Sequence, residues 1–536
     1  MKAKIDVRQE FKKYLDKQSK KSASAISSYV KCIESLPQIL KRKNELSRLN
    51  GESEIWNIQS IGTITALYNY VLKEQKVGRN GLFKDETPPS LWANMFYSAA
   101  LGSYKNFLTH NTLKSPIPNE NESPTSTEKI KSIIPKSPFS IDNFKTCIGK
   151  AGLVFSEKLI IRFVSSVLTK PFVILTGLSG SGKTKLAQCF VQWICESKEQ
   201  YKIVPVGADW TNREPLLGFP NGLDEGKYVL PDSGALQLLI NAINPVNINK
   251  PYFLILDEMN LSHVERYFAD FLSIMESKDE IKLYSGKDRK CSEGKTIKKE
   301  VSWPKNLFII GTVNVDETTY MFSPKVLDRA NVIEFRVSEI DMGAYLKSAG
   351  ELNMNMFFVD EDKDKAGVGS NMAVDFMRIA KNFATPIISI NIALVEFFKE
   401  LKKAGAEFGY RSASEINRLI AILEILTEKE TKWDEVNIDR GNDFIDIAIM
   451  QKLLPKVHGS RSKLNTILTS LAKLCVENGV LDYKGKDEDF RKAYFLPADE
   501  ITADKKAKII YLISFEKITR MHKNAIDNGF TSYAEA

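Results

Sequence analysis

The residues best suited to chemistry stand at 177–184, which read Gly-Leu-Ser-Gly-Ser-Gly-Lys-Thr. The apolar run 171–176 precedes them, and the helix-like run 185–194 follows. Glycines let backbone N–H groups surround a phosphate, and the following helix directs the positive end of its dipole to the same point. A chance match in a loop is the alternative, but the flanking strand and helix favour a nucleoside triphosphate site.

Every residue of this loop is a candidate for binding the nucleotide. The set is Gly177, Leu178, Ser179, Gly180, Ser181, Gly182, Lys183 and Thr184. In such a loop Lys183 would reach the β- and γ-phosphates, and Thr184 would place its hydroxyl on Mg²⁺. The sequence therefore predicts ATP (or GTP) and Mg²⁺ as cofactors.

Two carboxylates follow an apolar run at 252–256, namely Asp257 and Glu258. At the carboxyl edge of a parallel sheet, Asp257 can hold Mg²⁺ through water, while Glu258 can orient and deprotonate the attacking water. A strand that ends in Asp-Glu is common in isolation. Its place after the glycine-rich loop favours the catalytic interpretation.

Two more polar residues lie where a phosphate-transfer site would need them. Asn314 follows the apolar strand pattern 307–312 and is a candidate for binding the γ-phosphate or the lytic water, with a structural turn asparagine as the alternative. Arg329 precedes the apolar run 332–335. An arginine there is a candidate for reaching the nucleotide of a neighbouring subunit and stabilising transition-state charge, with a salt-bridged surface arginine as the alternative.

The elements that must position these residues are short apolar strands that alternate with helical stretches. Alternation of this kind predicts a parallel sheet covered by helices. The polar segment 278–303 looks like a hairpin insertion, and helical patterns dominate after about residue 340. The expected strands are 172–176, 201–206, 252–256, 307–312 and 332–335.

The predicted fold class is therefore multidomain α/β. Residues 1–108 are predicted to form a small all-α domain, 109–140 a linker with five prolines, 141–340 the nucleotide-binding core, and 341–536 a helical lid and C-terminal extension. In the first domain, aromatic and aliphatic residues recur at helical spacing, and we expect them to form its core rather than a base-stacking platform. These residues are Trp92, Phe96, Tyr97, Leu101, Tyr104 and Phe107.

The charge of the chain is concentrated in its first fifth. Residues 1–108 contain 18 Lys and Arg against 10 Asp and Glu, whereas the rest contains 57 of each, so the whole excess of +8 lies in the first domain. Such an excess is typical of a segment that binds a polyanion, and we expect DNA to bind there. A solvated lysine-rich helical surface is the alternative.

The composition of the chain indicates the cellular compartment in which we expect it. No stretch reaches the roughly 20 apolar residues of a membrane span, and the N-terminal residues lack the apolar region of a signal peptide. The six cysteines are scattered without a C-x-x-C pair, and the four histidines have no zinc spacing. They favour reduced thiols in a cytoplasmic protein without membrane partners.

Taken in order, these motifs resemble those of AAA+ ATPases. Asp257-Glu-Met-Asn260 with Met275-Glu276, and Gly311-Thr-Val-Asn-Val-Asp-Glu317, are similar to the McrB branch. The resemblance covers roughly 150–470. It implies a hexameric motor of a modification-dependent restriction system, with an N-terminal DNA-recognition domain and a separate McrC-like nuclease as partner.

The chain departs from this branch at two positions. Asp316 stands two residues after Asn314 rather than three, which puts the branch's preference for GTP in doubt and favours ATP. Asp328-Arg329 leaves one arginine where the better-known members have a pair. In the lid, Arg411 opens a helix and is a candidate for folding over the nucleotide, with a helix-surface arginine as the alternative.

The leading functional hypothesis is a defence motor that binds DNA through residues 1–108 and activates a nuclease. A MoxR-like protein-remodelling ATPase is the alternative from another class, in which residues 1–108 would bind protein. A nucleotide-gated scaffold with little turnover is a third hypothesis, against which Glu258 argues.

Overall fold

The computed structural model describes two units, residues 1–130 and 131–536. Within the first unit the described residues are 7–17, 23–43, 45, 49, 54–58, 64, 67–68, 70–72, 74–75, 82–83 and 96–112. In the second they are 137–533 except 278, 316–319, 321, 338, 349, 360–365, 383–385, 387–390, 404, 428–439 and 498–499.

The described part of the first unit is helical. Its helices include α1 (Val7–Lys17), α2 (Ala23–Arg42) and α5 (Phe96–Thr112). Tyr97, Leu101, Tyr104 and Phe107 are all buried in a core of their own, as predicted for core residues. Trp92 lies outside the described residues.

The second unit is built on a five-stranded parallel sheet, which confirms the five predicted strands. The strands are β1 (Phe172–Gly177), β2 (Tyr201–Pro205), β5 (Tyr252–Asp257), β10 (Leu307–Asn314) and β11 (Asn331–Phe335). Their order is β11-β1-β10-β5-β2, so β1 lies between β10 and β11. Every residue of β1 and β10 is buried, as expected for central strands covered on both faces.

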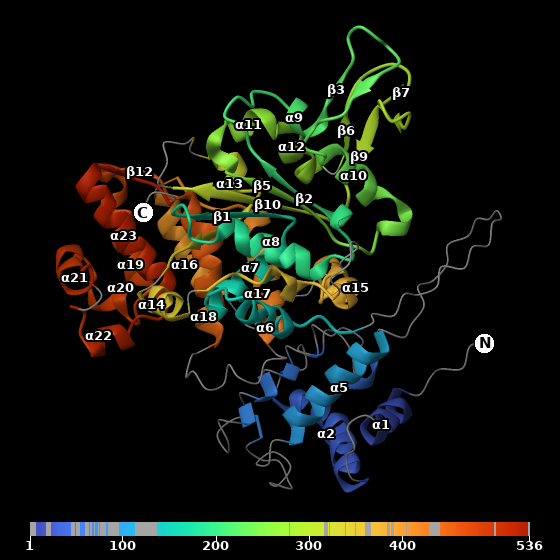
Figure 1. Cartoon of the computed structure of the whole chain (residues 1–536). Coiled ribbons are helices and arrows are strands. Elements are labelled where there is room, and N and C mark those ends of the chain that lie inside the picture. The colour runs from blue at the N-terminus through green and yellow to red at the C-terminus, as the bar shows by residue number, and fades with distance from the viewer. Residues whose placement is uncertain are drawn as a thin grey trace. The chain divides into compact units, whose positions relative to one another are not determined.

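Helices cover both faces of this sheet (Figure 1). On one side lie α7 (Glu157–Thr169) and α8 (Lys183–Ile194), and on the other α11 (Val264–Tyr267) and α12 (Ala269–Ser277). Ser156 caps α7, since its hydroxyl accepts a hydrogen bond from Leu159 N. Shorter or flanking helices are α6 (Asp142–Lys150), α9 (Glu214–Leu217), α10 (Ala235–Ile243) and α13 (Pro324–Leu327).

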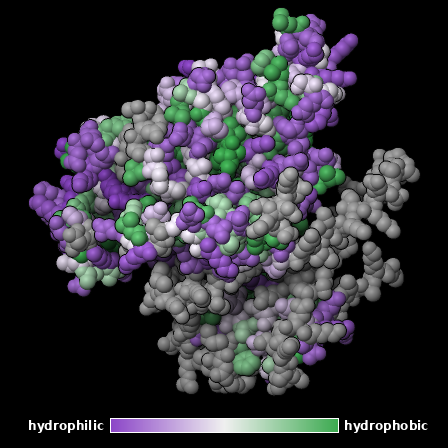
Figure 2. All heavy atoms as spheres, viewed as in Figure 1, coloured by the Kyte–Doolittle hydropathy of each residue, from purple (hydrophilic) through white to green (hydrophobic). Residues whose placement is uncertain are grey.

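Two hairpins project from the core (Figure 1). The predicted insertion forms two nested antiparallel pairs, β6 (Glu280–Lys282) with β9 (Glu300–Ser302) and β7 (Arg289–Lys290) with β8 (Thr296–Ile297). The second hairpin, β3 (Phe219–Pro220) with β4 (Tyr228–Val229), was not predicted, because its strands have only two residues each. Figure 2 shows hydrophobic atoms among hydrophilic ones at this projecting end.

The part after residue 338 is helical, as the sequence predicted. Its helices are α14 (Glu339–Ser348), α15 (Ala373–Lys381), α16 (Asn391–Lys403), α17 (Tyr410–Thr427), α18 (Arg440–Ala448), α19 (Arg461–Leu474), α20 (Gly479–Asp482), α21 (Asp487–Tyr494), α22 (Ala503–Ala507) and α23 (Leu512–Asn528). A short antiparallel pair, β12 (Gly459–Ser460) with β13 (Phe530–Thr531), joins the residues before α19 to those after α23.

A buried ion-pair network attaches α23 to the edge strand β11. Glu334 accepts hydrogen bonds from Lys517 Nζ at 2.8 Å and from Arg520 Nη2 at 2.7 Å. Burial lowers the pKa of Lys517 to about 8, and the charges of Lys517 and Arg520 hold the pKa of Glu334 below its usual value despite its burial. The C-terminal helices are thereby fixed to the strand that lies beside β1.

All six cysteines are buried and free. Burial raises the pKa of the Cys32 and Cys189 thiols to about 12, so these groups are unreactive at neutral pH. In the described part of the chain, none of the helices combines the length and the apolar character that crossing a bilayer requires.

Candidate nucleotide-binding site

The glycine-rich loop connects β1 to α8 with backbone angles that demand glycine. Gly180 and Gly182 have φ of 73° and 90°, and Gly182 immediately precedes the first turn of α8. A Cβ on Gly182 would lie 3.0 Å from the Phe155 ring, and a Cβ on Gly177 would lie 2.5 Å from Phe335 O. Side chains larger than glycine are therefore excluded by contact at Gly177 and Gly182, and the positive φ of Gly180 favours glycine there.

The side chain of Lys183 lies inside this loop. It is only 4% exposed, and its Nζ donates to Gly177 O at 2.9 Å and Leu178 O at 2.6 Å. Leu178, Ser179 and Gly180 are exposed at the tip. The ammonium is thus held at the mouth of the loop by carbonyl groups, where phosphate oxygens would be the stronger acceptors.

The two carboxylates at the end of β5 meet the loop as predicted. Thr184 Oγ1 donates to Asp257 Oδ1 at 2.6 Å, which joins the first turn of α8 to β5. Thr312 was not among the predicted site residues, but its Oγ1 also donates to Asp257 Oδ1 at 2.6 Å and accepts from Glu258 N at 3.0 Å. The available signal was its spacing, since Thr312 stands two residues before Asn314 and so shares its face of β10.

Asn314 lies next to the loop because the strand register pairs it with Gly177. It is 7% exposed, and its Nδ2 donates to Glu258 Oε1 at 3.1 Å. Asn260 also contacts this residue, since the Nδ2 of Asn260 donates to Asn314 O at 3.2 Å. The structure therefore brings Asn314 and Glu258 together at the carboxyl edge of the sheet, beside the loop.

Glu258 adopts a left-handed backbone conformation with φ of 54°, which Asn478 alone shares among the described non-glycine residues. For a side chain such as glutamate this conformation costs roughly 1–3 kcal/mol. In this conformation the Glu258 carboxylate lies next to Asn314, whose Nδ2 donates to it, at the point where β5 ends. Strain of this kind is typical of functional sites.

This strain predicts an inverted order of stability between two variants. Because glycine adopts φ of 54° without penalty, Glu258→Gly should be more stable than Glu258→Ala by about 1 kcal/mol. At the helical position Glu488 the order should be the usual one, with glycine about 1 kcal/mol less stable than alanine. Urea unfolding of the four variants measures both differences. Equal stability of the two Glu258 variants would show that the backbone there is relaxed.

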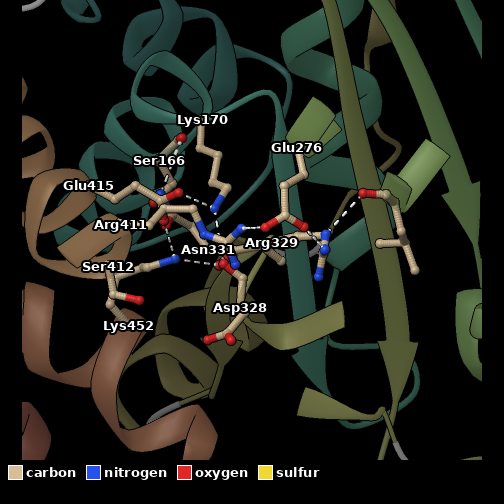
Figure 3. Close-up of polar contacts among 12 residues, drawn as sticks. Ser166, Lys170, Glu276, Asp328, Arg329, Asn331, Arg411, Ser412, Glu415 and Lys452 are labelled. Carbon is tan, nitrogen blue, oxygen red and sulfur yellow. Dashed lines mark hydrogen bonds and ion pairs between the residues drawn. The ribbon is translucent and has the colours of Figure 1, made fainter. Parts of the chain in front are cut away.

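The two candidate arginines lie together rather than apart. Arg329 donates to the Glu276 carboxylate, and Arg411 Nη1 donates to the other oxygen of Glu276 at 2.7 Å (Figure 3). Arg411, a candidate from the sequence for folding over the nucleotide or for the helix surface, pairs in the structure with the Glu276 carboxylate. Its role toward a nucleotide, and that of Arg329, remain predictions. Asp316 and Glu317 lie outside the described residues.

The residues at the site fit the predicted Mg²⁺. The Thr184 hydroxyl and the Asp257 carboxylate are adjacent, and both offer the oxygen ligands that Mg²⁺ prefers when it is shared with substrate phosphates. Within the described ranges, the side chains of His, Cys, Asp and Glu do not form a metal-binding group of three or more.

Comparisons with known proteins give two similarities. A family model described as a domain of unknown function (DUF8727) matches residues 371–530, which contain helices α15 to α23. No curated protein matches the chain. Among solved structures, the chain is similar to a protein titled "putative ATPase" from Cytophaga hutchinsonii, with 15% identity and a TM-score of 0.39, over 58% of this chain and 86% of that chain.

Proposed function

We propose that the chain is an AAA+ nucleoside triphosphatase that acts as the motor and DNA-recognition subunit of a McrBC-like restriction or anti-phage system. The observation that carries the enzymatic part is the convergence of Lys183, Thr184, Asp257, Glu258 and Asn314 at one edge of a five-stranded parallel sheet. Ligands of parallel α/β sheets bind at this carboxyl edge.

Each residue then has a defined task. Lys183 exchanges its carbonyl partners for the β- and γ-phosphate oxygens, and the loop N–H groups bind the phosphates. Thr184 and Asp257 would hold Mg²⁺, which would supply positive charge to the phosphates. Glu258 would accept the proton of the attacking water, and Asn314, which donates to the Glu258 carboxylate at 3.1 Å, would keep that carboxylate oriented for this task.

The nucleotide is ATP, with GTP as the second possibility. The spacing of Asn314 and Asp316 departs from the branch that prefers GTP. Direct competition between ATP and GTP for hydrolysis by the purified chain decides this point.

The role as a motor in a ring rests on the resemblance of the sequence to the McrB branch and on the position of Arg329. It implies a hexamer in which each subunit contributes Arg329 to the nucleotide of its neighbour, and a McrC-like nuclease as a separate partner. The nuclease would copurify with the chain.

DNA binding should depend on residues 1–108. Deleting them should abolish binding to a DNA duplex while basal ATP hydrolysis and assembly persist, because the segment holds the whole excess of +8 and lies within a separate compact unit, residues 1–130. Binding by the full chain should weaken linearly in log–log salt plots, with a slope of about −0.9 per phosphate contacted. Fluorescence anisotropy of a labelled duplex measures both effects.

Point variants give the matched control. Lys12, Lys13 and Lys41 are exposed on α1 and α2, so changing them to glutamate should weaken DNA binding strongly. Changing Lys492, which is exposed on α21, should leave it intact. DNA binding that survives the deletion would place the DNA-binding surface in another part of the chain. Binding of a protein by residues 1–108 in place of DNA favours the MoxR-like remodelling alternative.

A further inference from the structure

Each of the three guanidinium nitrogens of Arg329 donates one hydrogen bond within its own subunit, which uses three of its five N–H groups. Its Nε donates to Leu272 O at 2.9 Å, its Nη1 to Lys325 O at 2.8 Å, and its Nη2 to the Glu276 carboxylate. The side chain is 17% exposed. Arg329 therefore has a fixed orientation before any neighbouring subunit binds.

The same carboxylate holds a second arginine, which comes from the lid. Arg411, in the first turn of α17, reaches Glu276 from the opposite side to Arg329 (Figure 3). Two guanidinium groups repel each other, and burial together with the charge of Arg411 lowers the pKa of Arg329. The Glu276 carboxylate between them offsets that repulsion and leaves one net positive charge.

The backbone around Arg329 is also fixed to α17. Lys170 Nζ donates to Asp328 O at 3.1 Å, and Lys452 Nζ donates to Ala330 O at 3.0 Å, so both neighbours of Arg329 are held. Both lysines pair with Glu415, at 2.5 Å and 2.7 Å. Glu415 stands four residues after Arg411 and so shares its face of α17. The helix that supplies Arg411 thus also anchors the loop of Arg329.

We propose that Glu276 is a positioning residue that holds Arg329 and Arg411 as one paired site for the γ-phosphate of the nucleotide bound by a second copy of this chain. The inference rests on the proposed function and assigns Arg411 to the neighbour's nucleotide rather than to its own. Two planar guanidiniums match the geometry of phosphate oxygens, and a shared carboxylate fixes their spacing.

Mixed assemblies of inactive full-length variants test which nucleotide Arg411 serves. Mixing Arg411→Ala with Glu258→Gln should restore ATP hydrolysis, as should mixing Arg329→Ala with Glu258→Gln, because some interfaces then combine Glu258 of one variant with both arginines of the other. Mixing Arg329→Ala with Arg411→Ala should restore nothing, because no subunit carries the pair. If Arg411 served its own nucleotide, the first mixture would stay inactive and the third would recover, which would overturn the proposal.

The role of Glu276 is tested by separating turnover from binding. Glu276→Gln should lower kcat about 10- to 100-fold, the effect of misplacing a catalytic group by about 1 Å. The Kd of a fluorescent ATP analogue and the assembly state should not change. Glu276→Asp should recover part of the loss. In an Arg411→Ala background, Glu276→Gln should cost far less, since the pair is already broken.

Asp270→Asn provides the control on the same helix, because Asp270 pairs with Arg213 instead, and it should leave kcat unchanged. An unchanged kcat in Glu276→Gln, or a loss confined to nucleotide Kd or assembly, overturns the positioning role. Failure of the proposed function looks different, since the unmodified chain would then not hydrolyse ATP or Glu258→Gln would remain active.

Discussion

Replacing Lys183 by alanine should weaken ATP binding by at least about 100-fold. The ammonium lies inside the glycine-rich loop, 4% exposed, with loop carbonyls as its partners. Hydrogen bonds to a charged group contribute about 1.5–3 kcal/mol each, so losing two of them to phosphate oxygens gives an effect of this size. Isothermal titration with Mg²⁺ and a non-hydrolysable ATP analogue measures the change.

Lys185→Ala is the matched control for this prediction. Lys185 stands on the same helix two residues later, but its Nζ contacts Gln188 at 3.3 Å, so its loss should leave ATP affinity within about twofold. Comparable affinity of Lys183→Ala and the unmodified chain would place the nucleotide elsewhere.

The core of the fold was predictable because its strands carry an unambiguous signal. Each of the five predicted runs forms a strand, and alternation with helices predicted that the strands are parallel. The central strands β1 and β10 are wholly buried, whereas the edge strand β2 is largely exposed. Their lateral order was not predicted from residue patterns, since it depends on which strands pair. That order places Asn314 beside Gly177.

The parts of the site that escaped prediction are those that depend on contacts between distant segments. In the sequence Thr312 has the features of an ordinary strand residue. Only the folded sheet places it next to Asp257. Glu276 belongs to the Met275-Glu276 motif, but its neighbours in the sequence do not indicate that it holds Arg329 and Arg411, which are 53 and 135 residues away. Local patterns identify side chains that can do chemistry, whereas the side chains that position them are selected by tertiary packing.

These two kinds of residue also differ in the interactions that hold them in position. Residues 177–184 are predicted to bind phosphate through backbone groups, and the three glycines of the loop allow the geometry that this needs, so the motif alone predicts the site. The Arg329 loop instead owes its position to Lys170, Lys452 and Glu415, which come from three separate helical segments or their ends. Burying such charges is favourable only when every partner is present, so the network forms only with the complete fold.

Replacing Glu258 by glutamine should reduce ATP hydrolysis about 10²- to 10⁴-fold and leave ATP binding intact, the range that a general base contributes. The amide keeps the shape of the side chain and its place beside Asn314, but it cannot accept a proton from the attacking water. Thr184, Asp257 and Lys183 are untouched, so Mg²⁺ and phosphate contacts persist. The variant should therefore retain ATP and, if the chain forms rings, stabilise them. Steady-state phosphate release and equilibrium binding of the nucleotide measure the two effects separately.

Glu488→Gln, at an exposed position on α21, should leave both unchanged. Undiminished turnover in Glu258→Gln would exclude Glu258 as the base. A parallel loss of ATP binding would instead assign Glu258 to holding the cation, because a general base contributes to turnover and not to nucleotide affinity.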